Sequence, residues 1–186
     1  MLLGALVLGI AAGYARGGLL KNLASIELRG EGLMLAALAL QWLTPSIARA
    51  LRLPHNLAFV VWLAAFLLLL AALLLNRDQP ALLVAGLGVA SNLLVISLNG
   101  GMPVWPSALR VVSSGETVTA ATLAADPLYH LAGATTRLPF LADAVPVPWP
   151  SFATGVISVG DIILMAGVFW LVQDGMLYRG KRRIST

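Results

Sequence analysis

The chain has no cysteine and carries little charge. Of its 186 residues, 11% are charged and 59% are hydrophobic, and the mean hydropathy is +0.90. The missing cysteine excludes disulfides and thiol chemistry. Soluble domains carry about 25% charged residues, and disordered chains combine low hydrophobicity with high net charge. The composition therefore argues against both classes and predicts a chain embedded in a lipid bilayer.

Five apolar runs with almost no charge indicate membrane-spanning helices. A spanning helix needs roughly 20 mostly apolar residues, and the runs cover residues 1–15, 32–48, 56–75, 80–98 and 152–171. We expect the first run to be an uncleaved helix, because no basic residue precedes it while Arg16 and Lys21 follow it. The sequence thus predicts an all-α integral membrane protein. We expect one domain, residues 1–186, built as a bundle of about five transmembrane helices.

Residues 99–151 join the last two predicted helices and hold seven of the ten prolines. Proline interrupts regular helix, so we expect a long proline-rich loop with short helices near 106–113 and 116–125. An extended segment should follow over 135–150. Because apolar residues dominate even here, we expect the loop to lie on the bundle or to dip into the outer leaflet.

The distribution of Lys and Arg predicts the orientation of the chain. Cytoplasmic segments of membrane proteins are enriched in these residues. With the N-terminus outside, eight of them lie inside and four lie outside: Arg16, Lys21, Arg29, Arg77, Arg179, Lys181, Arg182 and Arg183 against Arg49, Arg52, Arg110 and Arg137. We therefore expect a multi-pass protein of the bacterial cytoplasmic membrane, with its C-terminus inside and residues 99–151 outside. The expected partners are membrane lipids, a larger membrane complex or a second copy of the chain, and no nucleic acid.

Asp161 is the most informative polar residue. The predicted helix boundary places it about 14 Å, or 9 residues, inside the last helix. A carboxylate at that depth costs a few kcal/mol and needs a partner, so we predict an ion pair with Arg137 or Arg110. Thr154 and Ser158 would continue a polar stripe toward the outside. The alternative is a carboxylate that binds a ligand or handles protons.

Other polar residues form smaller groups. Asn92 and Asn99 share a face of the fourth helix, and Asn99 begins a Gly-Gly helix stop whose freed carbonyls need donors or could bind a cation. Asp126 and His130 could do acid–base work or bind a metal, but metal sites usually have three or four protein ligands. We predict no metal, no cofactor and no catalytic residue. The ligand-binding candidates are Asn92, Asn99, Asp126, His130, Arg137, Asp143, Ser158 and Asp161.

Several motifs together resemble an uncharacterised family of small bacterial polytopic membrane proteins, a domain of unknown function. The resemblance covers nearly the whole chain. Its motifs are Arg16-Gly17-Gly18 with Asn22-Leu23, Ser91-Asn92, the run Leu98–Pro103, His130, the run Thr136–Asp143, and Ser158-Val159-Gly160-Asp161. The resemblance implies a bacterial membrane protein and brings no activity with it.

The segment from Phe152 to Asp161 also resembles part of lipoprotein signal peptidase, a small membrane aspartyl protease. Around Ser91-Asn92 the likeness fails at its most important residue, because Val95 stands where the first catalytic aspartate is expected. An aspartyl dyad needs two carboxylates that share a proton. Asp143 could supply the second one only if the loop folds inward.

Three functional interpretations remain. The first is a protein without enzymatic activity, either an accessory subunit or a binder of a lipid-like ligand. The second is an intramembrane hydrolase that uses Asp161 with Asp143 or His130 at the outer leaflet. The third is a transporter component, which the lack of an internal repeat disfavours. The missing dyad favours the first interpretation.

Overall fold

The computed structural model describes residues 2–112, 123, 126, 128–149 and 154–177. Its helices are α1 (Leu2–Ala15), the 3-10 helix η1 (Leu20–Ser25), α2 (Glu31–Ala50), α3 (His55–Leu74), α4 (Pro80–Asn99), α5 (Pro106–Val112), the 3-10 helix η2 (Pro139–Leu141) and α7 (Val159–Leu177). The strands are β1 (Met102–Val104), β2 (Tyr129–Leu131), β3 (Val145–Val147) and β4 (Gly155–Ile157). The chain is mostly helical, and among these residues α2, α3, α4 and α7 are long and apolar enough to cross a membrane.

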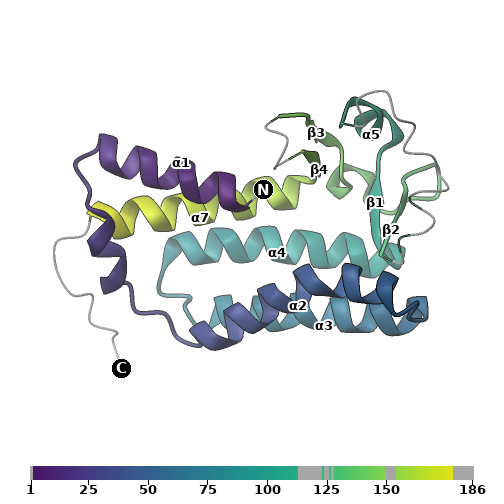
Figure 1. Cartoon of the computed structure of the whole chain (residues 1–186), viewed down its shortest axis with the longest axis horizontal. Helices are drawn as coiled ribbons and strands as arrows, with labels where there is room; N and C mark the ends of the chain where they lie inside the picture. The colour runs from purple at the N-terminus through teal and green to yellow at the C-terminus, as the bar shows by residue number, and fades with distance from the viewer. Residues whose placement is uncertain (1, 113–122, 124–125, 127, 150–153, 178–186) are drawn as a thin grey trace.

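The long helices form two pairs on either side of α4. Figure 1 shows α1 beside α7 on one side and α2 beside α3 on the other. Gly9 and Gly13 of α1 lie against Val172 and Met176 of α7, so these two helices run parallel. Gly160 of α7 lies against Asn92 of α4, and Gly167 lies against Ala85, so α4 and α7 run antiparallel. Small residues let these helix backbones approach closely.

The segment after α4 packs on one end of the bundle. Two small sheets gather there with α5 (Figure 1): β1 pairs with β2 in parallel, and β3 pairs with β4 antiparallel. Met102 and Leu128 from this segment join the buried cluster formed by α2, α3 and α4. The sheets were not expected from the sequence, and the predicted helix near 116–125 lies largely outside the described residues.

The last helix begins later than predicted. The other long helices differ from their expected bounds by at most two residues, but α7 runs from Val159 to Leu177 instead of 152–171, and residues 155–157 form strand β4. The cause is a capping box. Ser158 Oγ accepts a hydrogen bond from the Asp161 N–H at 3.0 Å, and Asp161 Oδ2 accepts one from the Ser158 N–H at 3.0 Å. The expected polar stripe of Thr154, Ser158 and Asp161 on one helix is therefore wrong.

Candidate functional site

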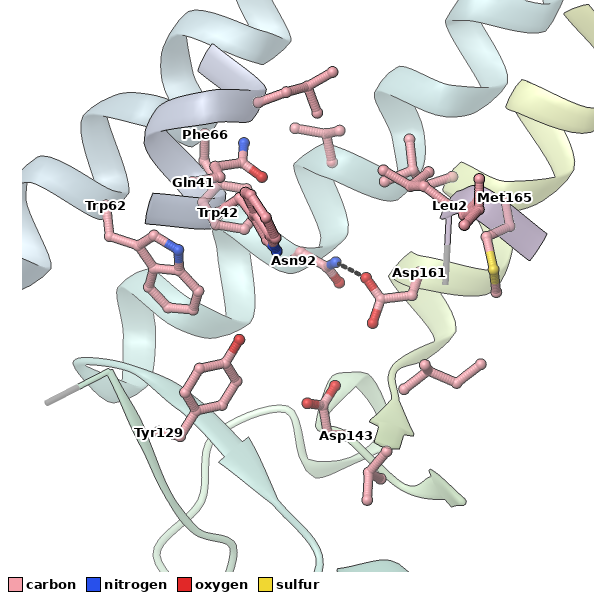
Figure 2. Close-up of a pocket in the computed structure, with 16 residues that line it drawn as sticks. Leu2, Gln41, Trp42, Trp62, Phe66, Asn92, Tyr129, Asp143, Asp161 and Met165 are labelled. Atoms are coloured by element: carbon pink, nitrogen blue, oxygen red, sulfur yellow. Dashed lines mark hydrogen bonds between the residues drawn. The ribbon is translucent and has the colours of Figure 1, made fainter. Parts of the chain in front are cut away.

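A pocket of about 480 Å³ lies where the bundle meets the segment that follows α4. All five long helices contribute side chains to its wall, and Tyr129, Asp143 and β4 close one end (Figure 2). Most of the wall is apolar and aromatic. The lining residues are Leu2, Leu3, Leu38, Gln41, Trp42, Trp62, Phe66, Val89, Asn92, Tyr129, Asp143, Val156, Ile157, Asp161, Leu164 and Met165.

The polar end of the pocket begins with a network that joins α4 to α7. Asn92 donates from Nδ2 to Asp161 Oδ1 at 2.7 Å, and its own Oδ1 accepts a hydrogen bond from Ser158 Oγ at 2.8 Å. Both oxygens of Asp161 therefore accept hydrogen bonds, one from Asn92 and one from the Ser158 N–H. The carboxylate also lies in the first turn of α7, where the partial positive charge of the helix N-terminus stabilises an anion.

The ion pair predicted for Asp161 is absent from the described residues. Arg137 is exposed and is held by its backbone: its N–H donates to Asn99 Oδ1 at 2.8 Å, and Asn99 Nδ2 donates to its carbonyl at 2.9 Å. The prediction of an arginine partner was wrong because it assumed a carboxylate in the middle of a helix. At a helix N-terminus, N–H groups and an amide take the place of the cation.

Asp143 supplies a second carboxyl group to the same pocket. Its backbone is fixed against β1 by hydrogen bonds from its N–H to the Pro103 carbonyl and from the Trp105 N–H to its own carbonyl, both 2.9 Å long. The residue is 6% exposed, and its Oδ1 has no hydrogen-bond partner within the described part of the chain. Burial, with a smaller contribution from the charge of Asp161, raises the pKa of Asp143 to about 8. At neutral pH this carboxyl group is therefore mostly protonated.

Tyr129 completes the polar end. Figure 2 shows its hydroxyl group and the Asp143 carboxyl group directed toward Asn92 and Asp161. The ring lies 5.5 Å from that of Trp62, centroid to centroid. Burial, followed by the charge of Asp143, raises the pKa of Tyr129 above its usual range, so the hydroxyl stays protonated and can donate. Sequence reasoning did not single out Tyr129, Trp62 or Gln41, because aromatic and amide side chains in apolar runs carry no motif.

Four other candidates, Asn99, Asp126, His130 and Arg137, lie away from this pocket. Consecutive strand residues face opposite sides, so His130 does not point where Tyr129 points. It lines a separate polar pocket of about 200 Å³ with Asn99, Thr136 and Arg137. Burial, with a smaller contribution from the charge of His55, lowers the pKa of His130. The structure thus brings Asp143 to Asp161 but does not bring His130 there.

Asp126 takes part in neither pocket. Its carboxylate lies 3.7 Å from Arg49 Nη1 and also accepts a hydrogen bond from the Leu128 N–H at 3.0 Å. It therefore links the C-terminal end of α2 to the turn before β2. The described residues contain no group of three or more His, Asp or Glu side chains that could hold a metal ion.

The large pocket opens between α1 and α2. Leu3 on α1 and Trp42 on α2 both line it, yet they are 59% and 82% exposed. Trp62 and Val89, at the other side of the pocket, are buried. The opening therefore faces sideways through the helices rather than along the bundle axis.

Fold and site together define a class: a bundle of apolar helices with a laterally open pocket that carries two carboxyl groups at its polar end. Residues 25–173 match the family described as "Family of unknown function (DUF5317)", and the chain belongs to this family. An uncharacterised protein of Thermotoga maritima is 32% identical over 106 residues, which cover 56% of this chain and 58% of that protein. No solved structure matches the chain. The family assignment confirms the resemblance drawn from the motifs.

Proposed function

We propose that the chain is an integral protein of the bacterial cytoplasmic membrane that binds an amphiphile in the large pocket. Large apolar side chains cover the outer faces of the helices, including Leu8, Leu35, Val60, Leu87 and Trp170. So many exposed large apolar side chains are unusual on a soluble monomer and suit a lipid environment. The excess of Lys and Arg on the side of the α1 and α7 C-termini supports an orientation with both of these ends in the cytoplasm.

The observation that carries the binding proposal is the division of the pocket into an apolar wall and a polar end. Small-molecule sites typically have volumes of about 300–1,000 Å³ and combine apolar walls with a few convergent polar groups. The apolar wall suits an alkyl chain, and Asn92, Tyr129, Asp143 and Asp161 suit a head group. The opening between α1 and α2 lets such a molecule enter from the bilayer without crossing water.

Quenching of Trp62 fluorescence tests this proposal. Trp62 is 4% exposed and lines the pocket, whereas Trp170 is 45% exposed on α7. In variants that keep one tryptophan each, dodecyl maltoside brominated on its chain should quench Trp62 saturably. The quenching of Trp170 should instead increase linearly with the concentration of this detergent in the membrane. If Trp62 is not quenched, or if its quenching increases linearly with detergent concentration without saturating, the pocket does not bind the detergent.

A matched pair of α2 variants provides the control. Leu38→Phe adds volume inside the pocket and should weaken the saturable quenching of Trp62 several-fold. Leu35→Phe makes the same change one turn away, at a position that is 68% exposed, and should leave it unchanged. Equal loss in both variants would point to a general disturbance of α2 rather than to the pocket.

The shared position of Asp143 and Asp161 favours a second candidate function, hydrolysis of a long-chain ester. Asp161 would take a proton from water while the water oxygen attacks the carbonyl carbon, and Asp143 would give its proton to the carbonyl oxygen. Collapse of the tetrahedral intermediate breaks the C–O bond, with the proton on Asp161 passing to the leaving alcohol and Asp143 recovering its own. Two carboxyl groups in different environments can divide the acid and base roles in this way. Val95, at the position where the resemblance expected the first aspartate, is buried in the core.

Release of p-nitrophenol from p-nitrophenyl palmitate in vesicles tests the hydrolase. Asp143→Asn and Asp161→Asn should each lower the rate by about 100-fold or more, since acid–base groups contribute about 10²–10⁴-fold. Asp78→Asn makes the same change at an exposed turn and should have no effect. Wild-type release no faster than that of empty vesicles, or release that survives both substitutions, would reject this function.

A further inference from the structure

The charge of the large pocket restricts what head group it can take. Two of its lining residues are Asp, and none of the described lining residues is Lys, Arg or His. A head group that carries phosphate or carboxylate would meet like charge at short range in a site of low dielectric, where repulsion is strong. The pocket therefore disfavours anionic lipids and free fatty acids.

The hydrogen-bonding groups at the polar end leave one acceptor unsatisfied. Asp161 is already bonded through both oxygens to Asn92 and Ser158. The Asp143 carboxyl group, by contrast, is buried with Oδ1 unpaired among the described residues. A buried polar atom without a partner is unusual in native proteins and calls for an explanation. A hydrogen-bond donor on a molecule bound in the pocket would supply this partner.

We propose that the pocket binds an amphiphile whose head group is a protonated amine, held by the carboxyl groups of Asp143 and Asp161. This inference rests on the proposed binding function and names its ligand class. An ammonium group has three donors and one positive charge, which suits Asp143 and Asp161 together. Hydrogen bonds between charged groups are roughly twice as strong as neutral ones, so the amine is preferred over an alcohol with the same chain.

Binding of the amine should also depend on pH, through Asp143 and the groups that face it. Asp161 on α7 and Tyr129 on β2 line the same pocket, and the nearby charges of Asp126 and Arg49 are paired with each other. The pKa of Asp143, about 8, means that below pH 8 the empty pocket holds a proton on this carboxyl group. Below pH 8 an ammonium group must therefore displace this proton to bind. Above pH 8 the carboxyl group is already deprotonated, and no proton has to be displaced. Affinity for the amine should therefore rise by about tenfold per pH unit up to pH 8 and then level off.

Competition with the brominated dodecyl maltoside measures this selectivity on single-Trp62 protein in phosphatidylcholine nanodiscs. The competitors are dodecylamine, dodecanol and dodecanoate, at pH 6, 7, 8 and 9. We expect dodecylamine to bind about tenfold or more tightly than dodecanol at pH 8, with dodecanoate the weakest. Only dodecylamine should show the rise in affinity with pH between 6 and 8.

Asp143→Asn supplies the control, because it keeps the shape of the side chain and removes the titration. This variant should lose the preference for dodecylamine and its pH dependence while still binding dodecanol. If dodecanol matches dodecylamine in the wild-type protein at every pH, the amine proposal fails and amphiphile binding stands. If no competitor displaces the brominated probe, both proposals fail. Displacement of dodecylamine by millimolar Mg²⁺ would assign a divalent-cation site instead and overturn the amine.

Discussion

Asp143→Asn is expected to stabilise the protein at pH 8 and to remove most of its loss of stability with rising pH. Because the folded-state pKa of Asp143 is about 8, against an ordinary value of 3.8, the folded protein binds more protons than the unfolded chain between these pH values. Stability must then fall as the pH rises through this window. A pKa difference of this size lowers the free energy of unfolding at pH 8 by on the order of a few kcal/mol. Asparagine has the same shape and does not ionise, so the variant avoids this cost.

The apparent melting temperature in detergent, measured from pH 5 to pH 9, tests this prediction. The wild-type curve should decline between pH 5 and pH 8, the Asp143→Asn curve should be nearly flat, and the two should separate most at the alkaline end. Asp78→Asn removes a carboxylate from an exposed turn and should follow the wild-type curve. A wild-type melting temperature that does not change over this range would mean that Asp143 is not buried as described.

The positions of the long helices could be predicted because each is bounded by local features. Charge interrupts the apolar runs at Glu31 and Arg77, and proline and glycine mark the ends of α4 at Pro80 and Gly100. Each helix needs only its own residues to satisfy its backbone hydrogen bonds, so composition alone locates it. The start of α7 was missed although Ser158-Val159-Gly160-Asp161 has the spacing of a capping box. The predicted start came from a count of apolar residues, which does not detect that spacing. Gly155–Ile157 is as apolar as the residues of a spanning helix, so the count included it in the last helix.

The composition of the site could be predicted only in part, because it depends on contacts between distant segments. Asp143 reaches the pocket through hydrogen bonds to Pro103 and Trp105, some 40 residues earlier in the chain. The residues next to Asp143 in the sequence do not indicate those contacts. Asn92 and Asp161 were each singled out, but their bond to one another depends on how closely α4 and α7 pack. Their pairing therefore needed the structure.

Gly88→Ala is expected to be among the most damaging single-methyl additions in the bundle. A Cβ atom at this position would lie 2.5 Å from the Gly160 carbonyl oxygen and 2.5 Å from the Leu164 backbone N. Both are backbone atoms of α7, so no side chain can rotate away and the two helices must separate. Overpacking costs about 1–3 kcal/mol where side chains can adjust, and we expect at least the upper part of that range here. Because Asn92 lies one turn further along α4, the separation should also break its 2.7 Å bond to Asp161.

Gly86→Ala on the same helix is the matched comparison for this prediction. Its Cβ atom would lie 3.9 Å from Leu70 and Leu73, an ordinary contact distance. Both substitutions gain the same helix propensity, up to about 1 kcal/mol, so their difference isolates the contact between α4 and α7. We expect Gly86→Ala to keep the wild-type melting temperature or raise it slightly, and Gly88→Ala to lower it by several degrees and to weaken quenching of Trp62 by the brominated probe. Equal melting temperatures for the two variants would show that α4 and α7 lie further apart than described. The network that holds Asp161 at the pocket would then lose its structural basis.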